Sequence, residues 1–347
     1  MLLRTLKAIA VFVGLILVAA LVFLWWASGG ETDGALVAPG EIEVLEAYLP
    51  DAPLPPAARL DVLTFNVGYG RGPEGDYAGP WTEAHIARHL EGIAAQIATS
   101  GADLVALQEV DLGAARSHYI HQGRRLAELL GWPYLSCVRT WENNYVPFPY
   151  WPPSRHYGRM VSGQCTLCRY PIARSTRYRL PQPAANPFWR NLFYLNRAIE
   201  HAEVTLPGGR TLHVYNVHLE AFDQVNRQRH IERLRELVDD NDSDLVVVLG
   251  DFNAPPPEAR ARDGFPDEPD SDFRGDTTIE TARTIRGLSQ ALPAPEAFTF
   301  PAEAPNRRLD YILYRDGLTL AGARVLDQTP VWSDHLPVLA SFSLTER

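Results

Sequence analysis

The sequence predicts one large α/β domain with two packed β-sheets and outer helices, preceded by one N-terminal transmembrane helix. Three observations support this prediction. Residues 8–27 carry no charge, and such a segment is long enough to cross the ~30 Å hydrocarbon core of a bilayer. Farther along, short apolar segments typical of strands outnumber amphipathic helical segments and are interleaved with them, which indicates one mixed domain. Apolar residues make up 46% of the 347 residues, enough for a substantial core.

The apolar segment 8–27 is flanked by charges of opposite sign. Arg4 and Lys7 precede it, and Glu31, Asp33 and Glu41 follow it. Positive residues stay on the cytoplasmic side of a membrane helix, so residues 1–7 are expected in the cytoplasm. The chain is therefore predicted to be a single-pass membrane protein whose domain lies in the periplasm or outside the cell.

A cleaved signal peptide is the alternative interpretation of this segment. Its apolar region would normally be shorter, and the bulky Trp25 and Trp26 stand where a small-residue cleavage site is needed. Tryptophan is common where a membrane helix meets the interface. We therefore expect an uncleaved anchor.

Residues 28–58 separate the anchor from the first convincing strand. They are rich in proline, alanine and acidic residues, and proline interrupts both helices and sheets. We expect an irregular linker that lifts a single domain, residues 59–347, off the membrane.

Hydrophobic periodicity and turn residues predict the elements of this domain in order. Strands are expected at residues 60–67, 102–110, 164–169, 176–180, 193–206, 210–219, 245–249, 309–314 and 337–343, and helices at 82–100, 117–131 and 221–239. The strands around Pro207, Gly208 and Gly209 are expected to form a hairpin. The aromatic and proline-rich stretch 141–157 fits no regular element, and is interpreted either as a lid or substrate wall or as a small secondary core.

Charge and cysteine content narrow the functional class. A net charge of −10 argues against a general affinity for nucleic acid. Cys137, Cys165 and Cys168 have too few neighbouring ligands for a structural zinc site, which we do not expect. One disulfide with one spare thiol is compatible with an oxidising compartment, and the pairing stays open. The sequence does not indicate an oligomeric state.

The predicted strands end in polar residues that suit metal and proton chemistry. In residues 244–257 a buried strand stops at Gly250 and delivers Asp251 and Asn253 at a turn closed by three prolines. The whole set is Asn66, Glu109, Asn216, His218, Asp251, Asn253, Asp310, Asp334 and His335. Oxygen donors without a thiolate suit Mg²⁺ or Mn²⁺, and histidines beside acids suit proton transfer, so the set favours metal-assisted hydrolysis at phosphorus. Each residue alone is equally explained as a polar group closing a turn.

Six motifs, in this order, resemble the endonuclease/exonuclease/phosphatase superfamily. They are FN at 65–66, LQEV at 107–110, NVHLE at 216–220, GDFNAPP at 250–256, LDYIL at 309–313 and SDHLPV at 333–338. The resemblance covers residues 60–344 and implies an α/β fold of the four-layer sandwich type, with two packed mixed β-sheets flanked by helices. It also implies a Mg²⁺-dependent phosphoesterase site at one edge of the sheets.

The resemblance also implies roles for individual residues. Glu109 corresponds to the principal metal ligand, with Asn66 beside it and Asp334 completing the acidic side. Asp251 corresponds to the residue that orients or deprotonates the attacking water, and Asn253 to one that hydrogen-bonds the phosphoryl oxygens.

Two histidines and their neighbours complete the implied site. His335 corresponds to the catalytic histidine and Asp310 to the carboxylate that fixes its tautomer. His218 corresponds to a second histidine, a candidate acid for the leaving group. Arg197 and Asn216 are expected to bind substrate. Where relatives often have serine in the motif at 167–172, this chain has Cys168, a difference that looks structural.

The expected substrate is a phosphate ester, and its identity stays open. The anchor and the aromatic stretch 141–157 favour a lipid head group or another substrate met outside the cytoplasm. A nuclease is the less favoured alternative, because the chain is acidic and lacks a lysine-rich patch. A membrane-tethered binding protein without activity is the alternative of another class, but Glu109, Asp251 and His335 are all present. The sequence does not separate diester from monoester substrates.

Overall fold

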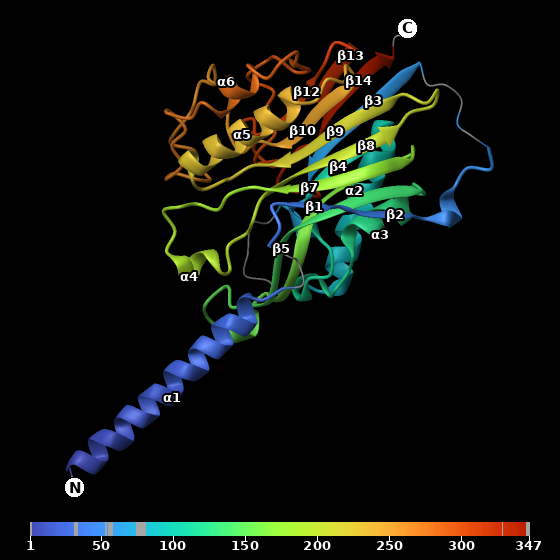
Figure 1. Cartoon of the computed structure of the whole chain (residues 1–347). Coiled ribbons are helices and arrows are strands. Elements are labelled where there is room, and N and C mark those ends of the chain that lie inside the picture. The colour runs from blue at the N-terminus through green and yellow to red at the C-terminus, as the bar shows by residue number, and fades with distance from the viewer. Residues whose placement is uncertain are drawn as a thin grey trace.

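The computed structural model describes residues 2–30, 34–52, 54, 58–73, 81–327 and 329–344, and it shows a two-sheet α/β domain with one long projecting helix (Figure 1). That helix, α1 (Leu2–Ser28), is long and apolar enough to cross a membrane. A signal sequence would meet the same criterion. Glu31 and Asp33, on which the predicted orientation partly depends, lie outside the described residues.

Two seven-stranded sheets form the domain. In spatial order the first contains β1 (Val37–Pro39), β7 (Ile172–Arg179), β8 (Ala198–Thr205), β9 (Thr211–His218), β10 (Val246–Asp251), β12 (Asp310–Tyr314) and β11 (Ser289–Gln290). The second contains β13 (Leu318–Val325), β14 (Val338–Leu344), β3 (Arg59–Asn66), β4 (Leu104–Asp111), β6 (Gly158–Cys168), β5 (Tyr134–Val146) and β2 (Glu41–Val44). β9 and β10 run parallel, as do β3 and β4, whereas the other pairs are antiparallel, so both sheets are mixed as predicted.

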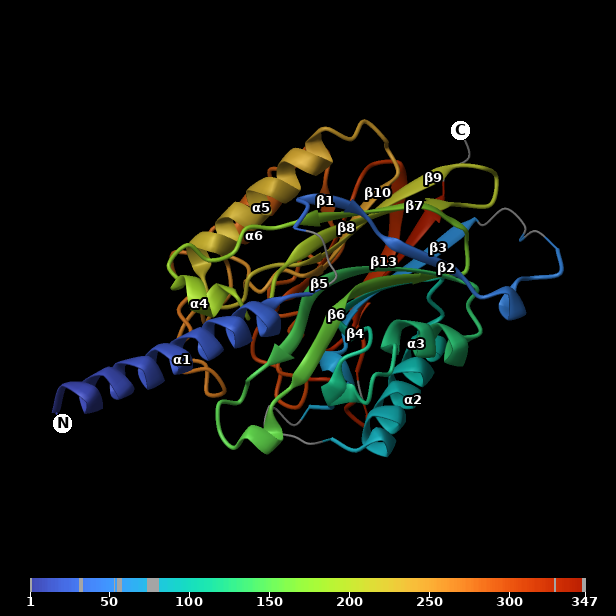
Figure 2. The same cartoon turned by 60° about the horizontal axis from the view of Figure 1, so that its bottom comes forward.

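Helices cover the outer face of each sheet (Figure 2). α2 (Glu83–Ser100) and α3 (Gln122–Leu130) pack on the second sheet, and α5 (Gln224–Asp239) and α6 (Thr278–Ala282) pack on the first. A third apolar cluster, which includes Leu60, Val247 and Ile312, fills the space between the sheets. The predicted α/β architecture of two packed sheets flanked by helices is therefore confirmed.

Several short elements complete the described chain. The helix expected at 82–100 is confirmed as α2. The short elements are α4 (Phe188–Asn191), η1 (Glu46–Tyr48), η2 (Gly68–Gly70), η3 (Ala115–Ser117) and η4 (Pro153–Arg155). α2 begins after Thr82, whose Oγ1 accepts a hydrogen bond from the His85 backbone N–H at 3.1 Å. It ends at Gly101, which takes a φ of 78°. The predicted hairpin forms as β8 and β9.

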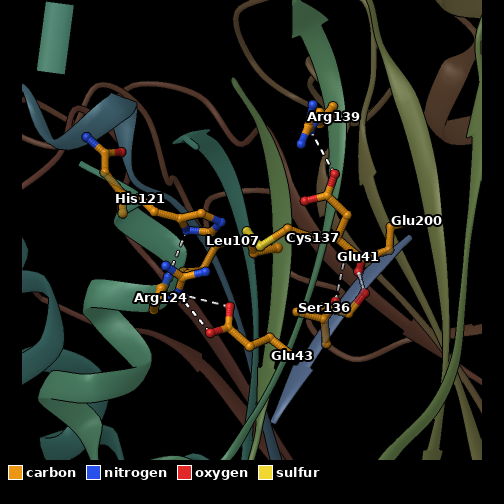
Figure 3. The surroundings of a disulfide bond; sticks show 12 residues. Glu41, Glu43, Leu107, His121, Arg124, Ser136, Cys137, Arg139 and Glu200 are labelled. Carbon is orange, nitrogen blue, oxygen red and sulfur yellow. Dashed lines mark hydrogen bonds and ion pairs between the residues drawn. A yellow bond between two sulfur atoms is a disulfide. The ribbon is translucent and has the colours of Figure 1, made fainter. Parts of the chain in front are cut away.

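The expectation of an irregular linker over residues 28–58 is wrong in part. β1 pairs with β7 at the edge of one sheet, and β2 pairs with β5 at the edge of the other. Glu41 and Glu43 of β2 form ion pairs with Arg139 and Arg124 (Figure 3). Proline is compatible with short edge strands because one side of an edge strand needs no ladder partner. Pro53, Pro55 and Pro56 lie outside the described residues.

Two further expectations need correction. The stretch 141–157 is not wholly irregular, because β5 continues to Val146 and pairs with β6, which begins at Gly158. Irregularities at Arg139/Trp141 and Asn143/Val146 obscure the alternation that would have revealed the strand. The helix expected at 117–131 is shorter, because its first residues form η3 and a turn, with His118 and Tyr119 at positive φ.

The domain contacts the end of α1 directly, so the described residues show no stalk between them. Asn144 donates from its backbone N–H to the Gly29 carbonyl at 2.7 Å and from Nδ2 to the Trp26 carbonyl at 2.9 Å. The ring of Tyr145 lies 6.0 Å from that of Phe23 and 6.4 Å from that of Trp26. β5 therefore holds the last turn of α1 against the domain.

Cys137 and Cys165 form a disulfide between β5 and β6, and Cys168 is free and buried (Figure 3). The bridge closes a loop with a sequence separation of 28. It lies under α3, where a Cβ on Gly123 would come within 2.7 Å of the Cys165 sulfur. The spare thiol is therefore Cys168, whose pKa burial raises to about 12.

Replacing both Cys137 and Cys165 with serine is expected to lower the free energy of unfolding by about 3 kcal/mol, because the unfolded chain regains the entropy of a closed loop of this size. Urea unfolding of wild type and variant measures the difference. Reductant should destabilise wild type and leave the double variant unchanged. An unchanged wild-type midpoint after verified reduction would contradict the prediction.

Glu200 is a fully buried acid between the two sheets. Its carboxylate accepts hydrogen bonds from Ser136 Oγ at 2.7 Å, Thr166 Oγ1 at 2.9 Å and Asn216 Nδ2 at 3.1 Å. Burial outweighs these donors and raises the pKa of Glu200 to about 7. The group is therefore protonated in the folded protein over a pH range where it is ionised in the unfolded chain.

The raised pKa of Glu200 predicts a pH-dependent stability. The stabilising contribution of Glu200 to the free energy of unfolding is fully present below the unfolded pKa of ~4.3 and is lost as pH rises through about 7. Between pH 5 and pH 8 the free energy of unfolding should fall by an amount on the order of 2 kcal/mol. Glu200→Gln cannot ionise, so urea unfolding at both pH values should show a smaller difference than wild type. Glu43→Gln, at an exposed surface pair, is the control. Equal pH dependence in wild type and Glu200→Gln would refute the prediction.

Candidate active site

Strand register brings the predicted site residues to one edge of the two sheets. β9 and β10 are parallel, so both end at this edge, and antiparallel β12 begins there. Asp251, the last residue of β10, therefore lies opposite His218 on one side and Asp310 on the other. Asn66 ends β3 of the second sheet at the same edge, so side chains of both sheets converge.

Asp251 is the centre of this cluster. Its Oδ2 accepts a hydrogen bond from Asn66 Nδ2 at 3.0 Å and lies 3.5 Å from His218 Nε2 and 3.7 Å from His335 Nε2. Burial, together with the neighbouring carboxylate of Asp310, raises the pKa of Asp251 although His335 opposes the rise. A carboxylate with a raised pKa is a stronger proton acceptor near neutral pH.

His335 and Asp310 form a buried pair beside Asp251. His335 Nδ1 lies 2.9 Å from Asp310 Oδ2, and both residues are at most 5% exposed. Thr299 Oγ1 accepts the backbone N–H groups of Leu309 and Asp310, which fixes the start of β12. Burial alone would lower the pKa of His335, but the charges of Asp310 and Asp251 outweigh it and raise the pKa. The imidazole is therefore a cation at neutral pH.

Asn253 is fixed by the turn after β10. It adopts a φ of 52°, its backbone N–H donates to Asp251 Oδ1 at 2.8 Å, and its Nδ2 donates to the Leu219 carbonyl at 3.0 Å. An amide nitrogen carries two hydrogens, so the second is available to a phosphoryl oxygen. The positive φ is a strained position that a rigid turn maintains.

His218 differs from the expectation of an acid. Arg197 Nη1 lies 2.8 Å from its Nδ1 and 2.6 Å from its Nε2. Burial and then the charge of Arg197 lower the pKa of His218 well below its ordinary value. The imidazole is therefore neutral at neutral pH, and it provides hydrogen bonding and orientation, not a stored proton. Arg197 lies at the site, in contact with His218, and its role in substrate binding stays a prediction.

The residues expected to hold a metal ion approach the same edge from the second sheet. Glu109 adopts a φ of 54°, and its Oε1 lies 3.8 Å from His218 Nε2. Asn66 Oδ1 accepts the Gly68 N–H at 3.1 Å, and a Cβ on Gly68 would meet Asp334 Oδ1 at 2.8 Å. Glu109, Asn66 and Asp334 are oxygen donors and thus fit a hard divalent ion, which would act as a Lewis acid toward a phosphoryl oxygen.

A second group at this edge also has the composition of a metal site. One ligand atom each of Asp251, Asp310 and His335 lies within 4.8 Å of the others, and all three residues are buried. Without a bound metal, the charges of Asp310 and Asp251 raise the pKa of His335 and favour its charged form, which suits anion stabilisation. The edge therefore has two groups of side chains that could hold a divalent cation, these three residues and the oxygen donors around Glu109.

Asn216 does not reach the site, contrary to its expected role in substrate binding. It is fully buried between the sheets, where its Oδ1 accepts from Gln108 Nε2 at 2.8 Å. Its Nδ2 lies 3.1 Å from the Cys165 carbonyl and from Glu200 Oε2. These contacts occupy its amide group, so Asn216 joins the two sheets.

Arg71 is a site residue that the sequence did not reveal. Its Nη2 lies 3.6 Å from Glu109 Oε2, and its Nε donates to the Gly68 carbonyl at 2.8 Å. It comes from the glycine-rich GYGRG segment, residues 68–72, which begins two residues after Asn66. The only signal in the sequence was this position, a glycine-rich turn that carries one cation close to a predicted ligand.

Comparisons with known proteins agree with this geometry. The sequence matches the Endonuclease/Exonuclease/phosphatase family over residues 63–335. A search of curated proteins finds no significant match. An endonuclease/exonuclease/phosphatase from Beutenbergia cavernae is 24% identical with a TM-score of 0.56, over 83% of this chain and 72% of that one.

Two further solved structures share the fold at lower identity. A member from Bacteroides vulgatus is 15% identical with a TM-score of 0.57, over 83% of this chain and 100% of its own. A mannosyl-6-phosphatase from Bacteroides thetaiotaomicron is 14% identical with a TM-score of 0.55, over 82% of this chain and 99% of its own. These similarities show the fold, and the family match spans most of the domain. The chain belongs to the endonuclease/exonuclease/phosphatase family.

Proposed function

We propose that this protein is a metal-dependent phosphoesterase that hydrolyses a phosphate ester by attack of water at phosphorus. The observation that carries the proposal is the convergence of Asp251 with the His335–Asp310 pair at the edge where Glu109 lies. A proton acceptor, a buried cation and a set of hard oxygen donors are what this reaction needs.

The side chains supply separate parts of the reaction. Asp251 takes a proton from the attacking water while the oxygen of that water forms the new bond to phosphorus. The bond from phosphorus to the leaving oxygen breaks, and that oxygen takes up a proton from solvent. His335 and Asn253 stabilise charge on the phosphoryl oxygens. The proton on Asp251 returns to solvent, so one ester and one water give one alcohol and one phosphate.

We propose a membrane lipid head group as the substrate class and Mg²⁺ or Mn²⁺ as the metal. The anchor helix supports the lipid, because it confines the domain to the membrane surface. The acidic net charge of −10 disfavours a nucleic acid. The mannosyl-6-phosphatase among the structural neighbours supports hydrolysis of phosphate esters on this fold.

A substrate panel tests this proposal. The assay uses the full chain in detergent, because a version starting near residue 56 would lack β1 and β2. DNA, phospholipids, sphingomyelin and phosphorylated inositols are compared with Mg²⁺ present, and Asp251→Asn is the inactive reference. Hydrolysis of DNA alone would replace the lipid assignment with a nuclease, and hydrolysis of nothing would favour a binding protein.

A further inference from the structure

The end of α1 fixes which face of the domain is closest to the membrane. Its last residues are held by β5, through the contacts of Asn144 and Tyr145 described above. Figure 1 shows α4 and the β5–β6 connection close to this point, and Figure 2 shows them on opposite sides of α1. Because no stalk intervenes, a bilayer that contains α1 must come close to both segments.

Both of these segments carry exposed aromatic side chains. We call Phe148, Tyr150, Trp151, Phe188 and Trp189 the aromatic collar. Trp151 is 80% exposed, Phe188 76% and Tyr150 75%. Such residues usually lie inside a soluble domain or mark an interaction surface when they gather in one region. Trp and Tyr prefer the membrane interface, where their rings contact acyl chains while their polar atoms meet head groups.

A basic pocket lies between the collar and the active site. It has a volume of about 470 Å³ and reaches from Ser28 and Gly30, after α1, to Phe188 on α4. Four arginines line it, Arg139, Arg177, Arg179 and Arg197, and Glu142 is the only carboxylate among its lining residues in the described chain. Arginines paired with interfacial aromatics suit a surface of phosphate-bearing head groups.

Arg197 connects this pocket with the catalytic edge. It lines the pocket, it is only 5% exposed, and its Nη1 contacts the ring of His218. Its Nε is buried without a hydrogen-bond partner among the described residues. A head group that enters from the collar side therefore reaches Arg197 before it reaches Asp251.

We propose that the aromatic collar inserts into the interface of the leaflet where α1 ends, so that the pocket and the catalytic edge open onto lipid head groups. The occupant of this surface is the bilayer itself, since the collar continues the surface of the anchor. This proposal rests on the proposed function, because it describes how the active site reaches a lipid substrate. The position of the collar relative to the bilayer is measured without any turnover of substrate.

The test measures how deeply the collar residues lie in the bilayer. The full chain is reconstituted in nanodiscs of phosphatidylcholine with some phosphatidylglycerol. Trp151→Cys and Phe188→Cys each carry a fluorescent label, and two quenchers are compared, nitroxide lipid and aqueous iodide. Ala321→Cys is the matched control, because Ala321 is exposed on β13, far from α1 in Figure 1. The native cysteines are buried or bridged, which limits background labelling.

Collar labels are expected to be quenched by nitroxide lipid and to be several-fold less sensitive to iodide than the Ala321 label. Collar labels as open to iodide as the control would overturn the proposal. Protection from iodide without lipid quenching would also overturn it and would indicate a second protein surface. Hydrolysis can fail while the labels report insertion, so failure of the proposed function is distinguishable from failure of this inference.

Discussion

Glu109→Gln is expected to weaken Mg²⁺ or Mn²⁺ binding and to lower kcat/KM by at least about a hundredfold, because the metal supplies several kcal/mol of transition-state stabilisation. The substitution keeps the size of the side chain and removes its charge. Glu109 lies at the edge of the site, where its two oxygens are 3.6 Å from Arg71 Nη2 and 3.8 Å from His218 Nε2. The contact with Arg71 is a long ion pair, and a divalent cation would compete with Arg71 for this carboxylate.

Metal binding is measured apart from catalysis, by the loss of the free Mn²⁺ electron-paramagnetic-resonance signal during titration. Glu43→Gln is the matched control, since Glu43 pairs with Arg124 on the surface of β2. The control should bind metal like wild type. Full wild-type activity in excess chelator, with metal content verified as nil, would refute metal dependence, and unchanged Mn²⁺ affinity in Glu109→Gln would exclude Glu109 as a ligand.

Much of the site could be predicted because parallel strands that share a sheet edge deliver their last residues to one place. Asn66, His218 and Asp251 each end a strand, and these ends meet. The prediction that Asn216 lies at this edge was wrong, although Asn216 belongs to the same motif as His218. It lies two residues earlier on β9 and faces the same way, but it is covered by the second sheet. Sequence shows which face a residue occupies and not how far along the strand the covering layer extends.

The fold was predictable wherever one face of an element is apolar, and less so at the edges. β10 is apolar from Val246 to Leu249 because both of its faces are covered. β1 and β2 are short, proline-flanked and mostly exposed, so no hydrophobic pattern distinguishes them from a linker. Their pairing depends on β7 and β5, which are at least 90 residues away, and local patterns do not carry such information. The contact of α1 with Tyr145 was hidden for the same reason.

His335→Ala is expected to lower kcat by about 10²-fold to 10³-fold, the usual cost of removing a group that stabilises charge in the transition state, with a smaller effect on KM. Its buried charge, maintained by Asp310 and Asp251, stabilises negative charge that grows on the phosphoryl group. Asp310→Asn should lower kcat in the same way but more mildly, because the imidazole remains and loses the partner at 2.9 Å that orients it.

The double variant, His335→Ala with Asp310→Asn, shows whether the two residues act together or independently. Asp310 acts through His335, so Asp310→Asn in the His335→Ala background should cost almost nothing further, and the two losses should not multiply. Asp316→Asn, an exposed acid just after β12, is the control and should match wild type. Steady-state kinetics of the single and double variants, with thermal unfolding to verify folding, give the comparison. If the losses multiplied, or if His335→Ala kept kcat within about threefold of wild type, a difference under ~1 kcal/mol, His335 and Asp310 would not act as a catalytic pair.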